Sequence, residues 1–131
     1  MHISVVSLQV ADLDRAIDFY TKSLGFEKTM DAPMGEENNL RWVTVAPPGG
    51  QTAISLIYGY GGWGPEKVGG DSGIVMEVDD VFAAGDKLKK NGVKFETEPC
   101  VEFFGGWARF KDSEGNILGL HSPAPANVSN N

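Results

Sequence analysis

The chain has 131 residues, enough to bury the core of one domain, and 41% of them are hydrophobic, as in ordinary globular proteins. Eighteen acidic residues outweigh eleven basic ones, and the net charge of −7 argues against nucleic acid or an anionic membrane surface as a partner. The single cysteine, Cys100, excludes an intrachain disulfide and suits a reducing cytosol, so we expect a cytoplasmic protein. We expect neither a signal peptide nor a membrane span, because no apolar run approaches the roughly 20 residues that cross a bilayer.

A strand followed by a capped amphipathic helix is predicted at the start of the chain. Residues 3–10 alternate between apolar and polar positions, as a half-buried strand does. Asp12 stands where an N-cap accepts hydrogen bonds from the free N–H groups of a first turn. Gly25 favours the left-handed conformation that ends a helix. Between them, apolar residues recur at helical spacing: Leu13, Ala16, Ile17, Tyr20 and Leu24.

Three more strands are predicted in the first half of the chain. They are rich in β-branched and aromatic residues and cover residues 26–30, 40–46 and 51–58. Residues 31–39 contain Pro33, Gly35 and paired asparagines, so we expect a loop there.

The same order of elements is predicted again in the second half. Residues 73–78 alternate as a strand, and Asp80 occupies the capping position of a second helix. The apolar stripe of that helix consists of Val81, Ala84, Gly85 and Leu88. The remaining strands are expected at residues 95–102, 107–111 and 116–121. A βαβββ unit that occurs twice predicts an α+β fold with two half-sheets, each covered by one helix.

The expected organisation is a single domain over residues 1–122. Its first module covers about residues 1–60, and its second covers about residues 72–122. Residues 61–71 are expected to form a linker between the modules. The remaining residues, 123–131, are poor in apolar side chains and are expected to form a flexible tail.

Three motifs carry a resemblance to a known superfamily. They are the first helix with its capping Asp12, Val78-Asp79-Asp80-Val81 ahead of the second helix, and Phe110-Lys111-Asp112-Ser113-Glu114-Gly115-Asn116. The last is similar to an Asp-Pro-x-Gly-Asn turn, with Ser113 in place of proline. Together they resemble the vicinal oxygen chelate superfamily of glyoxalase I, bleomycin-resistance proteins and extradiol dioxygenases. The resemblance implies a curved mixed sheet around an open cavity, with helices on the outer face, and commonly a homodimer.

The resemblance also implies four metal-ligand positions, and none of them holds a typical ligand here. Metal-dependent members of the superfamily bind a divalent cation through His and Glu side chains on the first, fourth, fifth and eighth strands. Transferred by motif, these positions hold Val5, Ser55, Gly73 and Gly119. Valine and glycine side chains offer no donor atom, and a lone serine hydroxyl is a poor ligand. We therefore expect neither a metal nor another cofactor, which disfavours glyoxalase and dioxygenase activity.

A displaced site is the alternative. His121 lies two residues beyond Gly119, and Glu77 lies four residues beyond Gly73, in each case on the same strand face. These two side chains are the candidates for a non-standard metal site in a lyase or dioxygenase, or for the base of a cofactor-free isomerase. The opposing interpretation makes His121 a half-exposed strand end and Glu77 a polar rim residue.

The preferred hypothesis is a metal-free protein that binds or sequesters a small organic molecule in a concave pocket, as bleomycin-resistance proteins do. A binding protein is favoured over an enzyme, because small and apolar residues stand at the metal-ligand positions and would make room in the cavity. Ligand pockets are mostly apolar with a few placed polar groups. Trp63 and Trp107 also lie in glycine-rich segments that resemble flaps over a pocket. The opposing interpretation assigns the aromatic residues to the core or to a dimer interface, and a third makes the chain an interaction subunit without a ligand. The candidate pocket residues are Val5, Ser7, Trp42, Ser55, Ile57, Trp63, Gly73, Phe104, Trp107, Arg109, Gly119 and His121.

Overall fold

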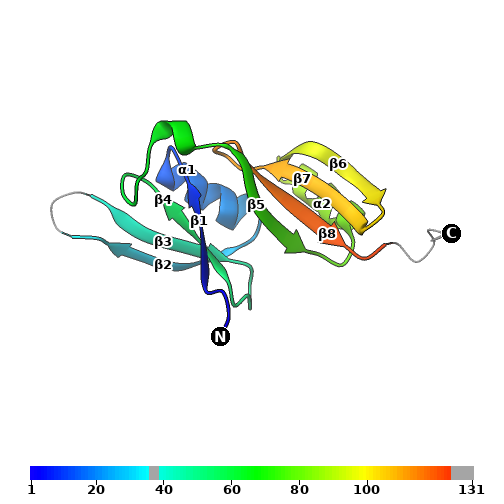
Figure 1. Ribbon diagram of the computed structural model, residues 1–131, viewed down its shortest axis with the longest axis horizontal. Helices are drawn as coiled ribbons and strands as arrows, with labels where there is room; N and C mark the ends of the chain where they lie inside the picture. The colour runs from blue at the N-terminus through cyan, green and yellow to red at the C-terminus, as the bar shows by residue number, and fades with distance from the viewer. Residues whose placement is uncertain (36–38, 125–131) are drawn as a thin grey trace. The chain divides into compact units, whose positions relative to one another are not determined.

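The computed structural model describes residues 1–35 and 39–124 (Figure 1). Most of the predicted tail, residues 125–131, lies outside the described residues. The chain divides into two compact units, one made of Met1–Gly70 with Ser113–Asn116 and the other of Asp71–Asp112 with the chain from Ile117 onward. The order βαβββ occurs twice, so the predicted repeat is confirmed, and the fold is α+β with two four-stranded mixed sheets. No helix of the described part is long and apolar enough to cross a membrane.

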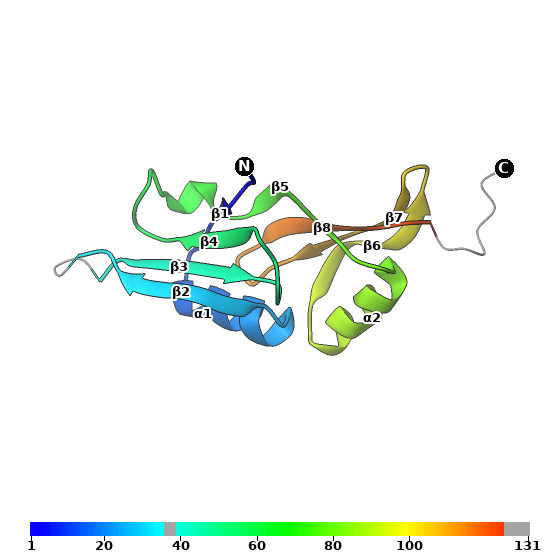
Figure 2. The same cartoon turned by 90° about the horizontal axis from the view of Figure 1, so that it is seen from below.

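The sheet of the first unit has the strand order β1-β4-β3-β2. Its strands are β1 (Val5–Gln9), β2 (Glu27–Pro33), β3 (Arg41–Ala46) and β4 (Ala53–Ile57). β1 runs parallel to β4, and the other neighbouring strands are antiparallel. Helix α1 (Leu13–Asp18) covers one face of this sheet (Figure 2). The core between them consists of Leu8, Val10, Ala16, Tyr20, Val43, Val45, Ile54 and Leu56.

The first helix begins as predicted and then changes its winding. The Oδ1 atom of Asp12 accepts a hydrogen bond from the Arg15 N–H at 3.0 Å, as an N-cap does. After Asp18 the chain continues as a π-helix, Phe19–Ser23, where an uninterrupted α-helix was expected. Gly25 then adopts a φ of 76° and ends the helical segment, as predicted.

Strand β2 is longer than the sequence pattern indicated. Residues 31–33 were expected in a loop but belong to the strand, which ends at Pro33. Proline fits there because β2 lies at the edge of the sheet, where no neighbouring strand needs its missing N–H. The pairing shifts register between Lys28 and Met30, and the Oγ1 of Thr29 at this bulge lies 2.6 Å from the Oγ1 of Thr44.

The second unit repeats the arrangement with strand order β5-β8-β7-β6. Asp80 caps its helix, as predicted, by accepting a hydrogen bond from the Phe82 N–H at 2.8 Å. Of the predicted apolar stripe, Val81 and Gly85 are buried. The helix lies close to β6, since a Cβ added at Gly85 would be 2.6 Å from Cγ of Pro99. The elements are β5 (Gly70–Glu77), α2 (Val81–Lys90), β6 (Lys94–Glu102), β7 (Gly105–Lys111) and β8 (Asn116–Ser122).

The turn between β7 and β8 belongs to the first unit, which the module boundaries predicted from sequence did not foresee. The Glu114 side chain is fully buried and accepts hydrogen bonds from the N–H groups of Ala11 (2.9 Å) and Asp12 (2.8 Å). Arg15 Nε donates to the same carboxylate at 2.8 Å. Burial raises the pKa of Glu114, but these hydrogen bonds and one from Ser113 outweigh it and hold the pKa below its usual value.

Asn116 completes the attachment of this turn. Its Oδ1 accepts a hydrogen bond from the Gly69 N–H at 2.9 Å, and its Nδ2 donates to the Gln9 carbonyl at 3.0 Å. The motif that carried part of the family resemblance therefore holds together the start of α1, the end of β1 and the segment before β5.

Candidate functional site

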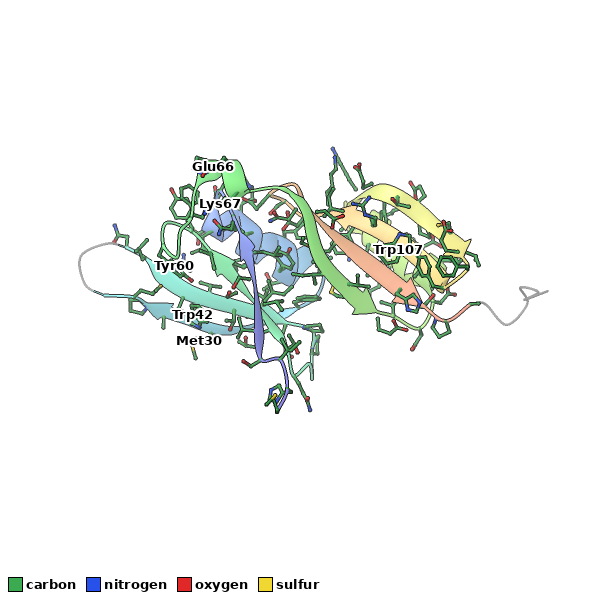
Figure 3. All side chains as sticks on the ribbon, in the orientation of Figure 1. Met30, Trp42, Tyr60, Glu66, Lys67 and Trp107 are labelled. Carbon is green, nitrogen blue, oxygen red and sulfur yellow. The ribbon has the colours of Figure 1, made fainter. Side chains whose placement is uncertain are left out.

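Each sheet has a face opposite its helix, which we call the open face of that unit. In the second unit, α2 packs on the face that contains Gly106, because a Cβ added at Gly106 would lie 2.8 Å from Cγ2 of Val81. Strand alternation then turns Trp107 and Arg109 to the open face. Trp107 pairs with His121 of β8, and Arg109 pairs with Gly119. Figure 3 shows Trp107 on β7 within this sheet.

The indole ring of Trp107 lies over Gly119. A Cβ added at Gly119 would be 2.7 Å from Cη2 and 3.1 Å from Cζ3 of Trp107. It would also be 3.2 Å from Cγ2 of Val75 on β5. The space that a side chain at position 119 would need is therefore filled by an aromatic ring.

His121 uses both of its ring nitrogens. Nδ1 lies 2.6 Å from Oε1 of Glu77, and Nε2 lies 2.7 Å from the carbonyl oxygen of Phe104. Because a carboxylate and a carbonyl only accept, the ring makes both bonds only as an imidazolium. The Phe104 carbonyl and then the Glu77 carboxylate raise the pKa of His121. The expected convergence of Glu77 and His121 is thus present, while their catalytic role stays a prediction.

Two phenylalanines extend the aromatic surface from the turn between β6 and β7. The ring of Phe104 stacks near His121, with centroids 6.0 Å apart and planes at 23°. It also meets Trp107 edge-on, with centroids 5.5 Å apart. Phe103 packs edge-on against Phe104 at 5.0 Å and is 99% exposed. We call Phe103, Phe104, Trp107 and His121 together the aromatic surface. Phe103 was not predicted as a pocket residue, because a phenylalanine in a turn has no distinguishing sequence signal.

A second ion pair on the open face involves Arg109, which pairs with Gly119. The Nη2 of Arg109 lies 2.8 Å from Oδ2 of Asp71 at the start of β5. The Arg109 side chain is 28% exposed and that of Asp71 is 67% exposed, so the pair borders solvent. The charge of the candidate residue Arg109 is therefore neutralised by the Asp71 carboxylate, which was not predicted as a site residue.

The open face of the first unit carries hydroxyl groups instead. Ser55 is fully buried, and its Oγ lies 2.8 Å from the Oγ of Ser7 on β1. Val5 on β1 is 38% exposed, while Trp42 on β3 and Ile57 on β4 are half-buried. Figure 3 shows Trp42 on β3. The structure thus places five of the predicted pocket residues on this face.

Trp63, another predicted pocket residue, is anchored by contacts inside the first unit. Its Nε1 donates a hydrogen bond to the Val10 carbonyl at 2.9 Å. Its ring packs against Tyr58 at a centroid distance of 4.7 Å. The residues that follow, Pro65–Lys67, form a 3₁₀ helix within the segment expected to be a linker. These contacts hold Trp63 within the first unit, and its role as a flap over a pocket stays a prediction.

The residues at the four family positions do not fit a metal centre. Ser55 shares its hydroxyl with Ser7, and Val5 has no donor atom. Gly73 has a φ of 72°, which strains any residue with a side chain, and Gly119 is covered by Trp107. Over residues 1–35 and 39–124, no three His, Cys, Asp or Glu side chains gather closely enough to hold an ion.

Open hollows occur in the described part of the first unit, and two of them contain none of the twelve candidate pocket residues given above. One, of about 500 Å³, is lined by Pro33, Gly35, Asn39, Leu40 and Arg41. The other, of about 360 Å³, is lined by Ala11, Asp12, Leu13, Asp14, Asn39, Arg41 and Tyr58. Arg41 borders both, but its guanidinium is already bound to Asp14 at 2.8 Å and to Asp31 at 2.6 Å. Hydrogen bonds from Arg41 and then Lys28 lower the pKa of Asp31 to about 2.

Comparison with known proteins agrees with the fold and the sequence motifs. A model of the Glyoxalase/Bleomycin resistance protein/Dioxygenase superfamily matches residues 2–120. The chain belongs to this superfamily. The resemblance found in the sequence is therefore confirmed.

The proteins that resemble this chain carry different names. The uncharacterised protein YetH of Bacillus subtilis (strain 168) is 36% identical over 116 residues, covering 88% of this chain and 93% of the relative. A lactoylglutathione lyase of Escherichia coli O157:H7 is 34% identical over 96 residues, covering 70% and 69%. Among solved structures, TnmS3, an antibiotic-binding protein from Streptomyces sp. CB03234, is 33% identical with a TM-score of 0.79, covering 95% of this chain and 97% of that one.

Proposed function

We propose that this protein binds a small planar organic molecule without a metal ion and without converting it. The observation that carries the proposal is the Trp107 indole lying over Gly119. The superfamily resemblance implies a metal-ligating side chain at position 119. In this protein the Trp107 indole ring occupies the space that such a side chain would need. Similarity to TnmS3, an antibiotic-binding protein, also supports a binding function.

The chemistry of the open face in the second unit favours an aromatic ligand. Trp107 and Phe104 offer ring surfaces, and each aromatic contact contributes about 0.5–1.5 kcal/mol beyond the area that it buries. The ion pairs His121–Glu77 and Arg109–Asp71 neutralise their own charges. The net charge of −7 favours a cationic ligand through the overall field. The proposed ligand is therefore a planar aromatic cation.

Proflavine, a planar aromatic cation, is the probe for a direct test. We expect it to quench tryptophan fluorescence, and we expect Trp107→Ala to weaken its affinity about tenfold or more through loss of stacking. Trp42→Ala removes the equivalent side chain from the other sheet and serves as the matched control, with affinity within about twofold of the original. Equal affinity for the original and the Trp107→Ala protein would overturn the assignment, as would a loss caused by Trp42→Ala alone.

The second candidate function is a lyase with a displaced metal or base site, which the lactoylglutathione lyase relatives favour. The geometry opposes it, because His121 has no ring nitrogen left for a metal while it holds Glu77 and Phe104. Metal analysis of protein purified without chelators distinguishes the two functions. One bound metal ion per chain, with lyase activity that follows its addition and removal, would establish the second function and exclude the first.

A homodimer is part of the same proposal, since the superfamily resemblance implies one. Sedimentation analysis at micromolar concentration tests it directly. A mass close to the 14.1 kDa of one chain would contradict it.

A further inference from the structure

We propose that His121 is a positioning residue that ties the turn between β6 and β7 to β5 and so sets the shape of the aromatic surface. This inference rests on the proposed function for its consequence, but the tie itself is a property of the unliganded protein. Its basis is the pair of hydrogen bonds that leave the two ring nitrogens in different directions. One ends on Glu77 of β5, and the other ends on the backbone carbonyl of Phe104 in the turn.

The local sequence makes room for this tie. Gly105 follows Phe104 and has a φ of 117°, a conformation that residues with side chains rarely adopt. A Cβ added at Gly105 would lie 3.1 Å from Nε2 of His121 and 2.5 Å from the Ser122 carbonyl oxygen. Glycine at this position therefore lets the imidazole reach the turn, and a side chain there would push the two apart.

Burial holds the residues of this turn only in part. Phe103 is 99% exposed and gains almost nothing from burial, and Phe104 is 43% exposed. The Phe104 ring nevertheless stands edge-on to Trp107 at 5.5 Å. Loss of the bond to the Phe104 carbonyl would free this ring and remove one wall of the aromatic surface.

The charged groups around the imidazole explain why it can donate twice. Glu77 is the carboxylate in contact with it, while Arg109 on β7 is engaged with Asp71. Glu102, at the end of β6, lies 3.7 Å from the Cys100 sulfur and is not a contact of His121. A neutral glutamine in place of His121 cannot reproduce two donor bonds in these two directions, whereas the five donors of an arginine can.

Amide hydrogen exchange across residues 102–106 of the free protein tests the tie. We expect His121→Gln to speed exchange in this turn about threefold to tenfold, and His121→Arg to restore part of the protection. The other histidine provides the matched control, since His2 is exposed and His2→Gln should leave the turn unchanged. The ¹⁵N shifts of the His121 ring should also report protons on both nitrogens.

Each result bears on the tie separately from the proposed function. Unchanged exchange in folded His121→Gln protein, or a ring that carries one proton, would overturn the inference. If His121→Gln does not fold, Glu77→Ala removes the carboxylate that holds Nδ1 of the ring and must loosen the same turn. A turn that loosens as expected in a protein that never binds proflavine would leave the tie standing and reject the planar-cation ligand. Where proflavine binds, its affinity should fall about threefold to tenfold in His121→Gln and recover in His121→Arg.

Discussion

The open faces of the two units have the same strand positions but different chemistry. On the first face, Gln9 of β1, Ile57 of β4 and Trp42 of β3 lie side by side across the strands. Gln9 pairs with Ile57 directly. Trp42 lies opposite Ile57 because Thr44 pairs with Ser55 and the two strands are antiparallel. On the second, the equivalent row consists of Glu77, His121 and Trp107. Each row ends in a tryptophan, so that residue alone does not distinguish the faces. The distinction comes from the residues beside it, which are an amide and an aliphatic side chain in one unit and an ion pair in the other.

The neighbouring residues on each face show that the two units lack the family's metal ligands in different ways. At the family position on β4, Ser55 keeps a polar side chain, and Ser7 satisfies it. At the equivalent position on β8, Gly119 has no side chain, and Trp107 occupies the space. A sequence repeat therefore specifies the backbone arrangement twice without specifying the same site twice. The chemistry of each face depends on pairs of neighbours across strands.

The largest expected effect comes from removing the Glu114 side chain, and it should appear in the first unit before the second. Glu114→Ala leaves the N–H groups of Ala11 and Asp12 and the Arg15 guanidinium without their buried acceptor, which should cost about 1.5–3 kcal/mol of stability. Amide exchange should rise around residues 11–16 in the first unit. Exchange that rises first in β7 and β8 would show that the turn does not belong with the first unit.

The same carboxylate gives this comparison a pH dependence. Because the folded-state pKa of Glu114 is lowered, its contribution is fully present above the unfolded value of roughly 4.3. It is lost as the pH falls through the folded-state pKa below that value. Thermal melts from pH 7 down to pH 3 should therefore show a smaller acid destabilisation in Glu114→Gln than in the original protein. Parallel curves would contradict the assigned pKa shift.

A smaller effect is expected when Gly119 acquires a side chain. Gly119→Ala forces the Trp107 ring or Val75 to move and should destabilise the chain by about 1–2 kcal/mol. The tryptophan emission should change as the indole is displaced. Gly119→Ala in a Trp107→Ala background should recover most of the lost stability, and a simple sum of the two losses would show that the ring does not fill this space.

The smallest expected effect concerns Ser55 on the first unit. Ser55→Ala breaks the bond to Ser7 but leaves no large group unsatisfied, because Ser7 is exposed and can bond to water. The expected loss is about 0.5–1.5 kcal/mol, measured by urea unfolding. Proflavine affinity should not change. A loss of affinity here would move the binding surface to the first unit.

Much of the fold follows from local sequence signals. Asp12 and Asp80 cap helices where their spacing indicates, and Gly25 ends the first helical segment. These features depend on a few neighbouring residues, so a single sequence reveals them. The extension of β2 through Pro33 was missed because proline is a strand breaker except at a sheet edge, and the strand order is not visible in the sequence.

The site is less accessible to sequence reasoning for a physical reason. Whether the space above Gly119 is empty or filled depends on the direction of the Trp107 side chain, which the sequence does not give. The contact between Glu77 and His121 was expected from strand alternation, yet the second bond to the Phe104 carbonyl was not, because a backbone acceptor has no sequence signature. The bond from Trp63 to the Val10 carbonyl was missed for the same reason.

The assignment of Ser113–Asn116 to the first unit has a consequence for synthesis on the ribosome. A nascent chain that has reached only Gly70 contains all four strands of the first sheet but lacks the carboxylate that accepts the N–H groups of Ala11 and Asp12. We expect this half to complete its hydrogen bonds only after translation has passed Asn116. A gene split after the first repeat should therefore yield an unstable N-terminal product unless the missing turn is supplied on a second polypeptide.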